Sequence, residues 1–98
     1  MKERKFEFGQ VVFTRAVAER AEADEGFERF VDESFLRHIC GDWGDLDPED
    51  AAMNDEALKT GEARLFSCYI FNKKRGEKIW IITEWDRSTT TVLFPSDY

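Results

Sequence analysis

The segment from Lys78 to Phe94 constrains the fold most, because it has the pattern of two β-strands joined by a tight polar turn. Residues 78–85 are mostly apolar or β-branched on both faces of an extended chain, which is typical of a central strand. Asp86, Arg87 and Ser88 favour a turn, and residues 89–94 return to β-branched types. Pro95 has no N–H to donate, so it predicts the end of the second strand.

Two further strands are predicted from shorter alternating patterns. Residues 64–71 alternate with a period of two, and the polar run 72–77 that follows them is typical of a hairpin loop. Three consecutive strands with short connections favour an antiparallel meander. A weaker alternation over Phe6–Val12 predicts a short first strand, which we expect at an edge of the same sheet.

Three helices are predicted between the first strand and the meander. Thr14 is the expected N-cap of a helix that ends at Ala23. A second helix over Gly26–Ile39 has the strongest helical period, and its expected inner face, widened by Leu36 and Ile39, consists of Phe27, Phe30, Val31, Ser34, Phe35 and His38. Asp47 caps a third helix that ends near Lys59 or Thr60. The order β-α-α-α-β-β-β predicts one α+β domain over residues 1–98, with a layer of helices on an antiparallel C-terminal meander.

Negative charge is concentrated in the middle of the chain, where the three helices are expected. The formal net charge is −7, and the segment from Glu19 to Glu62 carries 15 acidic and 4 basic residues. Such a segment repels nucleic acid phosphates and attracts basic protein surfaces. We therefore expect a protein partner with a basic surface and no direct contact with nucleic acid.

The densest group of carboxylates surrounds Trp43. Asp42, Asp45, Asp47, Glu49 and Asp50 could hold a divalent cation, but their spacing does not match the calcium-binding loop, and helix capping and turns explain them better. Trp43 lies between Asp42 and Gly44, and two roles are open to it. It either plugs the core beneath this loop or stands at the surface as an interface anchor.

A second polar group is expected at the end of the first strand of the Lys78–Phe94 segment. Glu84, Asp86 and Arg87 follow one another there, and His38 is the only histidine of the chain. These four residues could form an acid–base site. A structural ion pair between Glu84 and Arg87 or Arg64, together with a buried and hydrogen-bonded His38, explains the same residues without catalysis.

The sequence predicts no cofactor, no metal and no membrane segment. One histidine and two distant cysteines, Cys40 and Cys68, do not form a zinc motif, and we expect both cysteines to be reduced. No apolar run reaches the length that spans a bilayer, and the N-terminus lacks the apolar run of a signal peptide. The expected location is therefore the cytoplasm.

Several short motifs resemble a family of small, uncharacterised bacterial proteins associated with plasmids and phages. The matching segments are Gly9–Val12 with Thr14 and Arg15, Cys40–Leu46, Glu49–Asp50, Asn54–Asp55, Ile82–Ser88 and Thr90–Pro95. The resemblance implies no catalytic residues. It implies a mobile-element context, in which small acidic proteins act as inhibitors of host restriction and CRISPR systems.

These observations lead to one main functional hypothesis and two alternatives. The main hypothesis is a non-enzymatic inhibitor that mimics DNA and binds a nucleic-acid-binding host complex through Asp42, Trp43, Asp45, Glu49, Asp50, Asp55 and Glu56. The first alternative is a small enzyme or ligand-binding module that uses Glu84, Asp86, Arg87 and His38. The second is a regulator that acts by forming a homodimer.

Overall fold

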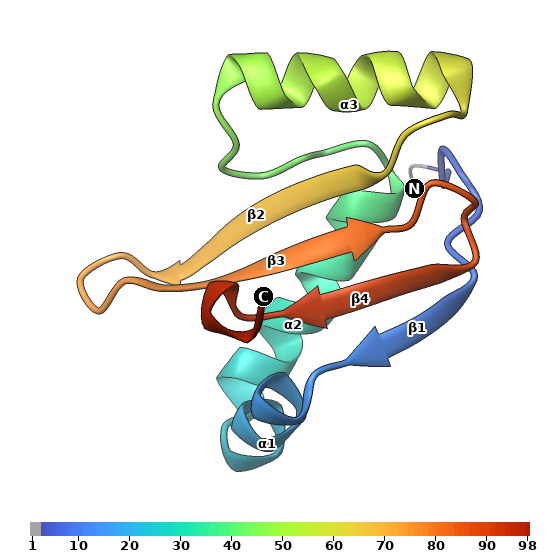
Figure 1. Cartoon of the computed structure of the whole chain (residues 1–98). Coiled ribbons are helices and arrows are strands. Elements are labelled where there is room, and N and C mark those ends of the chain that lie inside the picture. Colours follow the sequence, from blue (N-terminus) through green and yellow to red (C-terminus); the bar gives the residue numbers. More distant parts are fainter. Residues whose placement is uncertain (1–2) are drawn as a thin grey trace.

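The computed structural model describes residues 3–98 and shows an α+β domain with the predicted order of elements (Figure 1). The strands and helices are β1 (Gln10–Phe13), α1 (Arg15–Ala23), α2 (Glu25–Ile39), α3 (Pro48–Thr60), β2 (Leu65–Asn72), β3 (Glu77–Thr83) and β4 (Thr89–Leu93), followed by the short 3₁₀ helix η1 (Pro95–Asp97).

The strands form one sheet in the order β1-β4-β3-β2. β2, β3 and β4 make the predicted antiparallel meander, and β3 is a central strand as expected. β1 lies at the sheet edge, as predicted, but pairs with β4 in parallel, so that the sheet is mixed. It also starts at Gln10 rather than Phe6.

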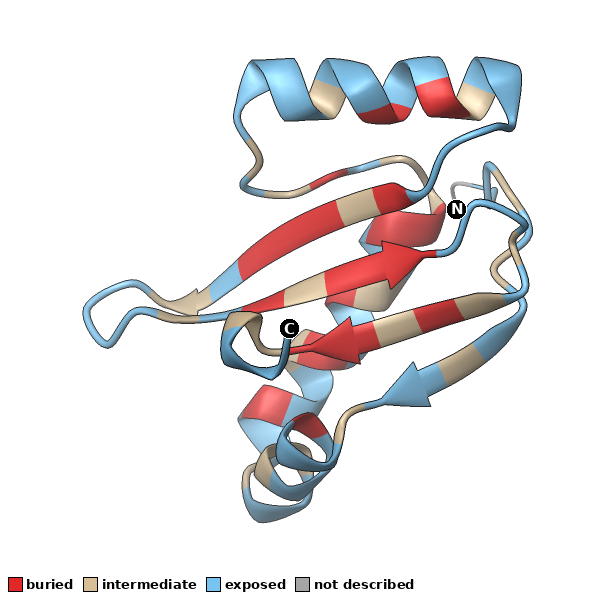
Figure 2. Ribbon diagram, viewed as in Figure 1, coloured by how far each residue is buried: buried red, intermediate tan, exposed pale blue. Residues whose placement is uncertain are grey.

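Helices α1 and α2 pack on one face of the sheet and create the main core (Figure 1). Thr14 caps α1 by accepting a hydrogen bond from the Val17 N–H, and Asp24 caps α2 in the same way from Gly26 and Phe27. The core contains side chains from both layers, namely Val17, Phe27, Val31, Tyr69, Ile79, Ile81 and Val92. Because alternate residues of each strand face this layer, buried and partly exposed positions alternate along β4 (Figure 2).

The bounds and burial of α2 and β3 also differ in part from the sequence prediction. Leu36 is 58% exposed and does not widen the buried stripe of α2. β3 ends at Thr83, because the Arg87 N–H donates to the Glu84 carbonyl at 2.9 Å and closes a turn, with Arg87 at a φ of 62°. Glu84 and Trp85 therefore belong to this turn, and Trp85 is 63% exposed although it was expected within the strand.

The third helix does not join the other two. α3 lies along the outer edge of the sheet beside β2, apart from the layer of α1 and α2 (Figure 1). A second, smaller core forms beneath it from Trp43, Ala57 and Leu65, with Phe6 and Leu46 among the flanking apolar residues. The acidic middle of the chain is therefore divided between two surfaces, and the expected single helical layer is not formed.

Candidate functional site

The candidate site is built on α3, whose ends are fixed by the local sequence. Asp47 is the N-cap and accepts a hydrogen bond from the Asp50 N–H at 3.0 Å, and Pro48 takes the first helical position. Glu49 and Asp50 lie in the first turn, where carboxylates interact favourably with the helix dipole. Gly61 ends the helix in the left-handed conformation.

Asn54 attaches this helix to the sheet. Its side-chain amide donates to the Phe66 carbonyl at 2.5 Å and accepts from the Phe66 N–H at 3.0 Å, as a neighbouring strand would. The loop before α3 continues this pairing along β2. The Cys68 backbone carbonyl accepts from the Asp45 N–H at 2.7 Å, and the Cys68 backbone N–H donates to the Trp43 carbonyl. The Ile70 N–H donates to the Asp45 carboxylate at 2.9 Å. The outer edge of β2 is thus covered at residues 66, 68 and 70.

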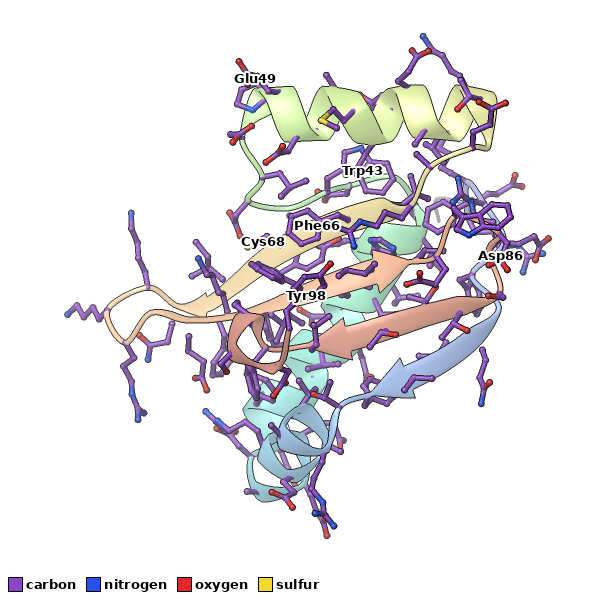
Figure 3. All side chains as sticks on the ribbon, in the orientation of Figure 1. Trp43, Glu49, Phe66, Cys68, Asp86 and Tyr98 are labelled. Carbon is purple, nitrogen blue, oxygen red and sulfur yellow. The ribbon has the colours of Figure 1, made fainter. Side chains whose placement is uncertain are left out.

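Trp43 is part of the core and not a surface anchor. Its side chain is 6% exposed, lies between α3 and β2, and donates from Nε1 to the Asp55 carboxylate at 2.9 Å (Figure 3). Its ring is 6.2 Å from Phe6 and 5.8 Å from His38, between ring centroids. Of the two roles left open by the sequence, the structure shows the core role, and Trp43 offers no surface to a partner.

The predicted partner-binding carboxylates fall into two groups. Asp42, Asp45 and Asp55 have internal roles, since Asp42 pairs with Arg37 at 2.8 Å, Asp45 binds the edge of β2, and Asp55 holds the Trp43 indole. All six residues are exposed, but no ion pair in residues 3–98 involves the other three, which are Glu49, Asp50 and Glu56. Figure 3 shows Glu49 at the start of α3, pointing away from the sheet.

An apolar groove of about 460 Å³ lies beside Asp50. It is on the sheet face opposite α1 and α2, because its lining residues Trp80 and Ile82 alternate with the core residues of β3. Asp50, Met53 and Asn54 line it from α3, and Phe66, Trp80 and Ile82 line it from the sheet, with Ala63, Arg64 and Tyr98 completing it. Met53 is 70% exposed. An exposed apolar surface of this kind marks a binding site more often than an isolated apolar residue does.

Three aromatic rings line the groove and pack edge to face. The centroid distances are 5.2 Å between Phe66 and Trp80 and 5.9 Å between Trp80 and Tyr98, within the range that aromatic pairs prefer. Arg64 donates to the Tyr98 hydroxyl at 2.8 Å and fixes the Tyr98 ring over β3 (Figure 3). From the sequence, Phe66 and Trp80 are predicted only as residues of alternating strands, and Tyr98 as part of a short tail. The one signal that could have indicated the groove was the excess of aromatic residues on both faces of the strands.

The polar site predicted at the end of β3 is not assembled. Arg87 donates to the carbonyl oxygens of Ala63, Glu84, Trp85 and Ala57, so that it binds the Glu84 backbone and not its carboxylate. The expected ion pair of Glu84 with an arginine is therefore absent from residues 3–98. Asp86 accepts from the Ser88 hydroxyl at 2.6 Å, which lowers the pKa of the Asp86 carboxyl.

His38 is a buried, fully hydrogen-bonded core residue, as the structural alternative predicted. Its Nδ1 lies 2.5 Å from the Ser67 hydroxyl and its Nε2 lies 2.9 Å from the Thr83 hydroxyl. Burial lowers the pKa of His38 to about 3. With both ring nitrogens occupied by hydroxyl groups, His38 does not form an acid–base pair with Glu84.

His38, Thr83, Thr90 and the Phe8 carbonyl form a buried series of hydrogen bonds. The donor of each bond follows from the Phe8 carbonyl at the end of the series. The Thr90 hydroxyl donates to the Phe8 carbonyl at 2.7 Å, because a carbonyl only accepts. Thr83 must then donate to Thr90, at 2.7 Å, and His38 Nε2 must donate to Thr83. The neutral ring therefore carries its proton on Nε2 and accepts from Ser67 at Nδ1. The chain links α2 to β2, β3 and β4.

The structure gives no support for a metal site or a membrane segment within residues 3–98. No three His, Cys, Asp or Glu side chains form a group that could hold a metal ion there. None of the described helices has the length and apolar character needed to cross a bilayer. Cys40 and Cys68 are not joined in a disulfide.

Comparisons with known proteins add no further assignment. No family model, no curated protein and no solved structure matches this chain. The resemblance to plasmid- and phage-associated proteins therefore stays a prediction. What the fold and the site define is a small α+β domain with a mixed sheet, an edge helix carrying free carboxylates, and an aromatic groove next to that helix.

Proposed function

We propose that this protein is a non-enzymatic binding protein that engages a basic, nucleic-acid-binding surface of a protein partner through α3. The observation that carries this proposal is the combination of three exposed carboxylates on α3, Glu49, Asp50 and Glu56, with an apolar groove that Asp50 lines. Exposed charges steer a partner of opposite charge, and an apolar surface supplies most of the contact area after docking.

The free carboxylates are suited to replace phosphates. They sit on a rigid helix that is fastened to the sheet at Asn54, so that little ordering is needed on binding. The partner would meet carboxylates where it normally meets nucleic acid. In line with the predicted mobile-element context, the proposed partner class is a host defence complex of the restriction or CRISPR type, and the proposed effect is inhibition by DNA mimicry.

The groove gives this surface a contact that charge alone does not provide. A basic partner segment that also carries an apolar side chain can place it on Phe66, Trp80 and Met53 while its cations face Asp50. Nonspecific attraction between charges would not need such a groove. Binding should therefore depend on the groove residues as well as on salt.

A charge-neutralisation experiment tests the proposal. The partner is captured from a host extract at low and high salt, and its affinity is then measured directly. Changing Glu49, Asp50 and Glu56 to the neutral Gln, Asn and Gln should weaken binding at least about tenfold, since each lost charge contact contributes about 0.5–1 kcal/mol.

The matched control changes three exposed acids of α2, Glu25, Glu28 and Glu33, to Gln. It removes the same net charge from the surface on the other side of the sheet, and it should bind like the unchanged protein. If both triple variants bind with the same affinity, α3 is not the partner-binding element and the proposal fails.

A further inference from the structure

The two edges of the sheet differ in whether their backbone groups are paired. The outer edge of β2 is covered residue by residue by Asn54, Trp43 and Asp45. β1 forms the other edge, and no element of residues 3–98 pairs with its outer side. An edge strand with unpaired N–H and C=O groups is a template for a further strand.

The register shows which backbone groups of β1 face outward. The N–H groups of Gln10 and Thr14 donate to the Ser88 and Val92 carbonyls of the β4 side, at 3.0 and 3.1 Å. Because backbone groups alternate in direction along a strand, those of Val11 and Phe13 point away from β4. Two residues with free donors and acceptors thus flank Val12 symmetrically.

β1 is short, which limits its free edge, but it has neither of the residue types with which proteins often protect an edge, a charge or a proline. Its four residues, Gln10–Phe13, include no charge and no proline, although the chain has a formal net charge of −7. Val12 is 38% exposed and Phe13 is 45% exposed. The strand is therefore an uncharged apolar strip on a strongly acidic molecule.

An apolar groove of about 350 Å³ runs beside this strip, between β1 and α2. Val11 and Phe13 line it from the strand, and Val31, Phe35 and the exposed Leu36 line it from the helix, with Asp32 at its rim. The groove lies on the helix-covered side of the sheet, since Val11 and Phe13 are in register with the buried Thr90 and Val92.

We propose that β1 pairs antiparallel with β1 of a second copy of this chain, centred on Val12. In this register Val11 of one copy lies opposite Phe13 of the other, and each of these two pairs forms two backbone hydrogen bonds. The Phe13 side chain of each copy then lies against Val11 and the groove of its partner. The arrangement is two-fold symmetric, as closed homodimers require.

The charge distribution favours a second copy over another occupant. A basic partner is attracted to the carboxylates of α3, at the far edge of the sheet, and not to an uncharged strip. Two copies of an acidic protein repel each other, so their contact has to be at an uncharged, self-complementary surface, and β1 is one. The proposal does not depend on the proposed function of α3.

Disulfide trapping tests the register. Two Val12 residues would face each other as a pair without direct hydrogen bonds, with Cα atoms about 4.5 Å apart, within the range of a disulfide. Val12→Cys should therefore form a disulfide-linked dimer under mild oxidation at least about ten times faster than Gln10→Cys, whose symmetry mates are about 14 Å apart in this register. The unchanged protein, with Cys40 and Cys68, reports any background. Equal rates for the two variants would overturn the register.

Sedimentation equilibrium tests the dimer itself. The unchanged 11.5 kDa chain should sediment as a dimer, and it should remain one in about 1 M salt, where the Debye length is about 3 Å. Val11→Pro removes an outward N–H that β4 does not use, so this variant should stay folded by circular dichroism and weaken dimerisation at least about tenfold. A monomeric unchanged protein, dissociation at high salt, or a folded Val11→Pro variant that dimerises normally would each contradict the proposal.

Discussion

At the scale of single residues, His38 shows how a polar ring is kept in an apolar core. The hydroxyl groups of Ser67 and Thr83 form hydrogen bonds with both of its nitrogens. Thr83 in turn donates to the Thr90 hydroxyl, which donates to the Phe8 carbonyl. Burial keeps the ring neutral, and in the neutral ring Nε2 donates to Thr83 while Nδ1 accepts from Ser67. The histidine is therefore a structural element of the fold, and its protonation opposes folding.

Acid should destabilise the protein through His38. Its pKa falls from about 6.5 in the unfolded chain to about 3 in the fold, so between these values the unfolded state binds more protons. The stabilisation is complete above about pH 6.5 and is lost as the pH falls towards 3. Between about pH 6.5 and pH 5, urea unfolding should show that the protein loses about 2 kcal/mol more than its His38→Gln variant does.

The His38→Gln variant serves as the control because the carboxylates titrate equally in both proteins. An equal loss in the two proteins would contradict a neutral buried ring. A nitrogen-15 spectrum of the imidazole gives an independent check, since it distinguishes the Nε2–H form predicted here from the Nδ1–H form.

Gly44 provides a second test at residue scale. A methyl group there would lie 2.6 Å from the Tyr69 ring and closer still to the Cys68 carbonyl, whereas Gly61, with a similar positive φ, has open space around it. Both Gly→Ala changes introduce the strain of a left-handed residue, about 1–2 kcal/mol. Gly44→Ala should cost about 1–3 kcal/mol more, measured by urea unfolding. Equal costs would show that the loop does not pack tightly on β2.

At the scale of elements, the connection between α3 and β2 decides where the proposed binding surface lies. α3 has a thin apolar face, on which only Asn54 and Ala57 are buried. The polar contact of Asn54 with the Phe66 backbone therefore complements a weak apolar contact. The Asn54 side chain therefore contributes strongly to the position of α3, and the sequence pattern of the helix does not indicate this.

Replacement of Asn54 should loosen α3 more than replacement of an exposed residue of the same helix whose side chain makes no hydrogen bond or ion pair within residues 3–98, such as Glu56. Asn54→Ala leaves the Phe66 N–H and C=O without their partner, which should cost about 2–4 kcal/mol of unfolding free energy. Glu56→Ala, on the exposed side, should change it by less than about 0.5 kcal/mol. Hydrogen exchange at the Phe66 amide should increase in the first variant, and unchanged exchange there would contradict the role of Asn54.

Most of the helices and strands were predictable from the sequence, because their positions depend on local signals. Asp47, Pro48 and Gly61 fix the ends of α3, and the alternation in residues 64–94 fixes the meander. The parallel pairing of β1 was not predictable, since it is a contact between distant segments. Trp43 illustrates the same limit, because its burial depends on Asp55 and Phe6 meeting it from other parts of the chain.

At the scale of the whole molecule, the acidic residues are not gathered on one helical layer, although the functional hypothesis drawn from the sequence depends on such a layer. The sequence predicts one acidic layer, but α3 lies apart from α1 and α2, and Asp42, Asp45 and Asp55 are engaged internally. Periodicity places acids on a helix, but it does not place one helix relative to another. The surface that supports the proposed function is therefore smaller, and it consists of Glu49, Asp50, Glu56 and the adjacent groove.

The two proposals combine into one arrangement. Pairing through β1 would extend the sheet across two copies and leave β2, with its α3, at each outer end. Two identical partner-binding surfaces would then face away from each other. Such a dimer binds two sites of a repetitive or dimeric partner more tightly than one copy does, provided that the spacing of the sites matches.

Displacement of nucleic acid from the captured partner tests the central claim most directly. Labelled nucleic acid is bound to the partner, the protein is added, and the released fraction is followed by fluorescence anisotropy. The account predicts release by the unchanged protein and by the α2 triple variant, and at least about tenfold weaker release by the α3 triple variant. Simultaneous binding of nucleic acid and protein to the partner, or equal release by the two triple variants, would contradict it.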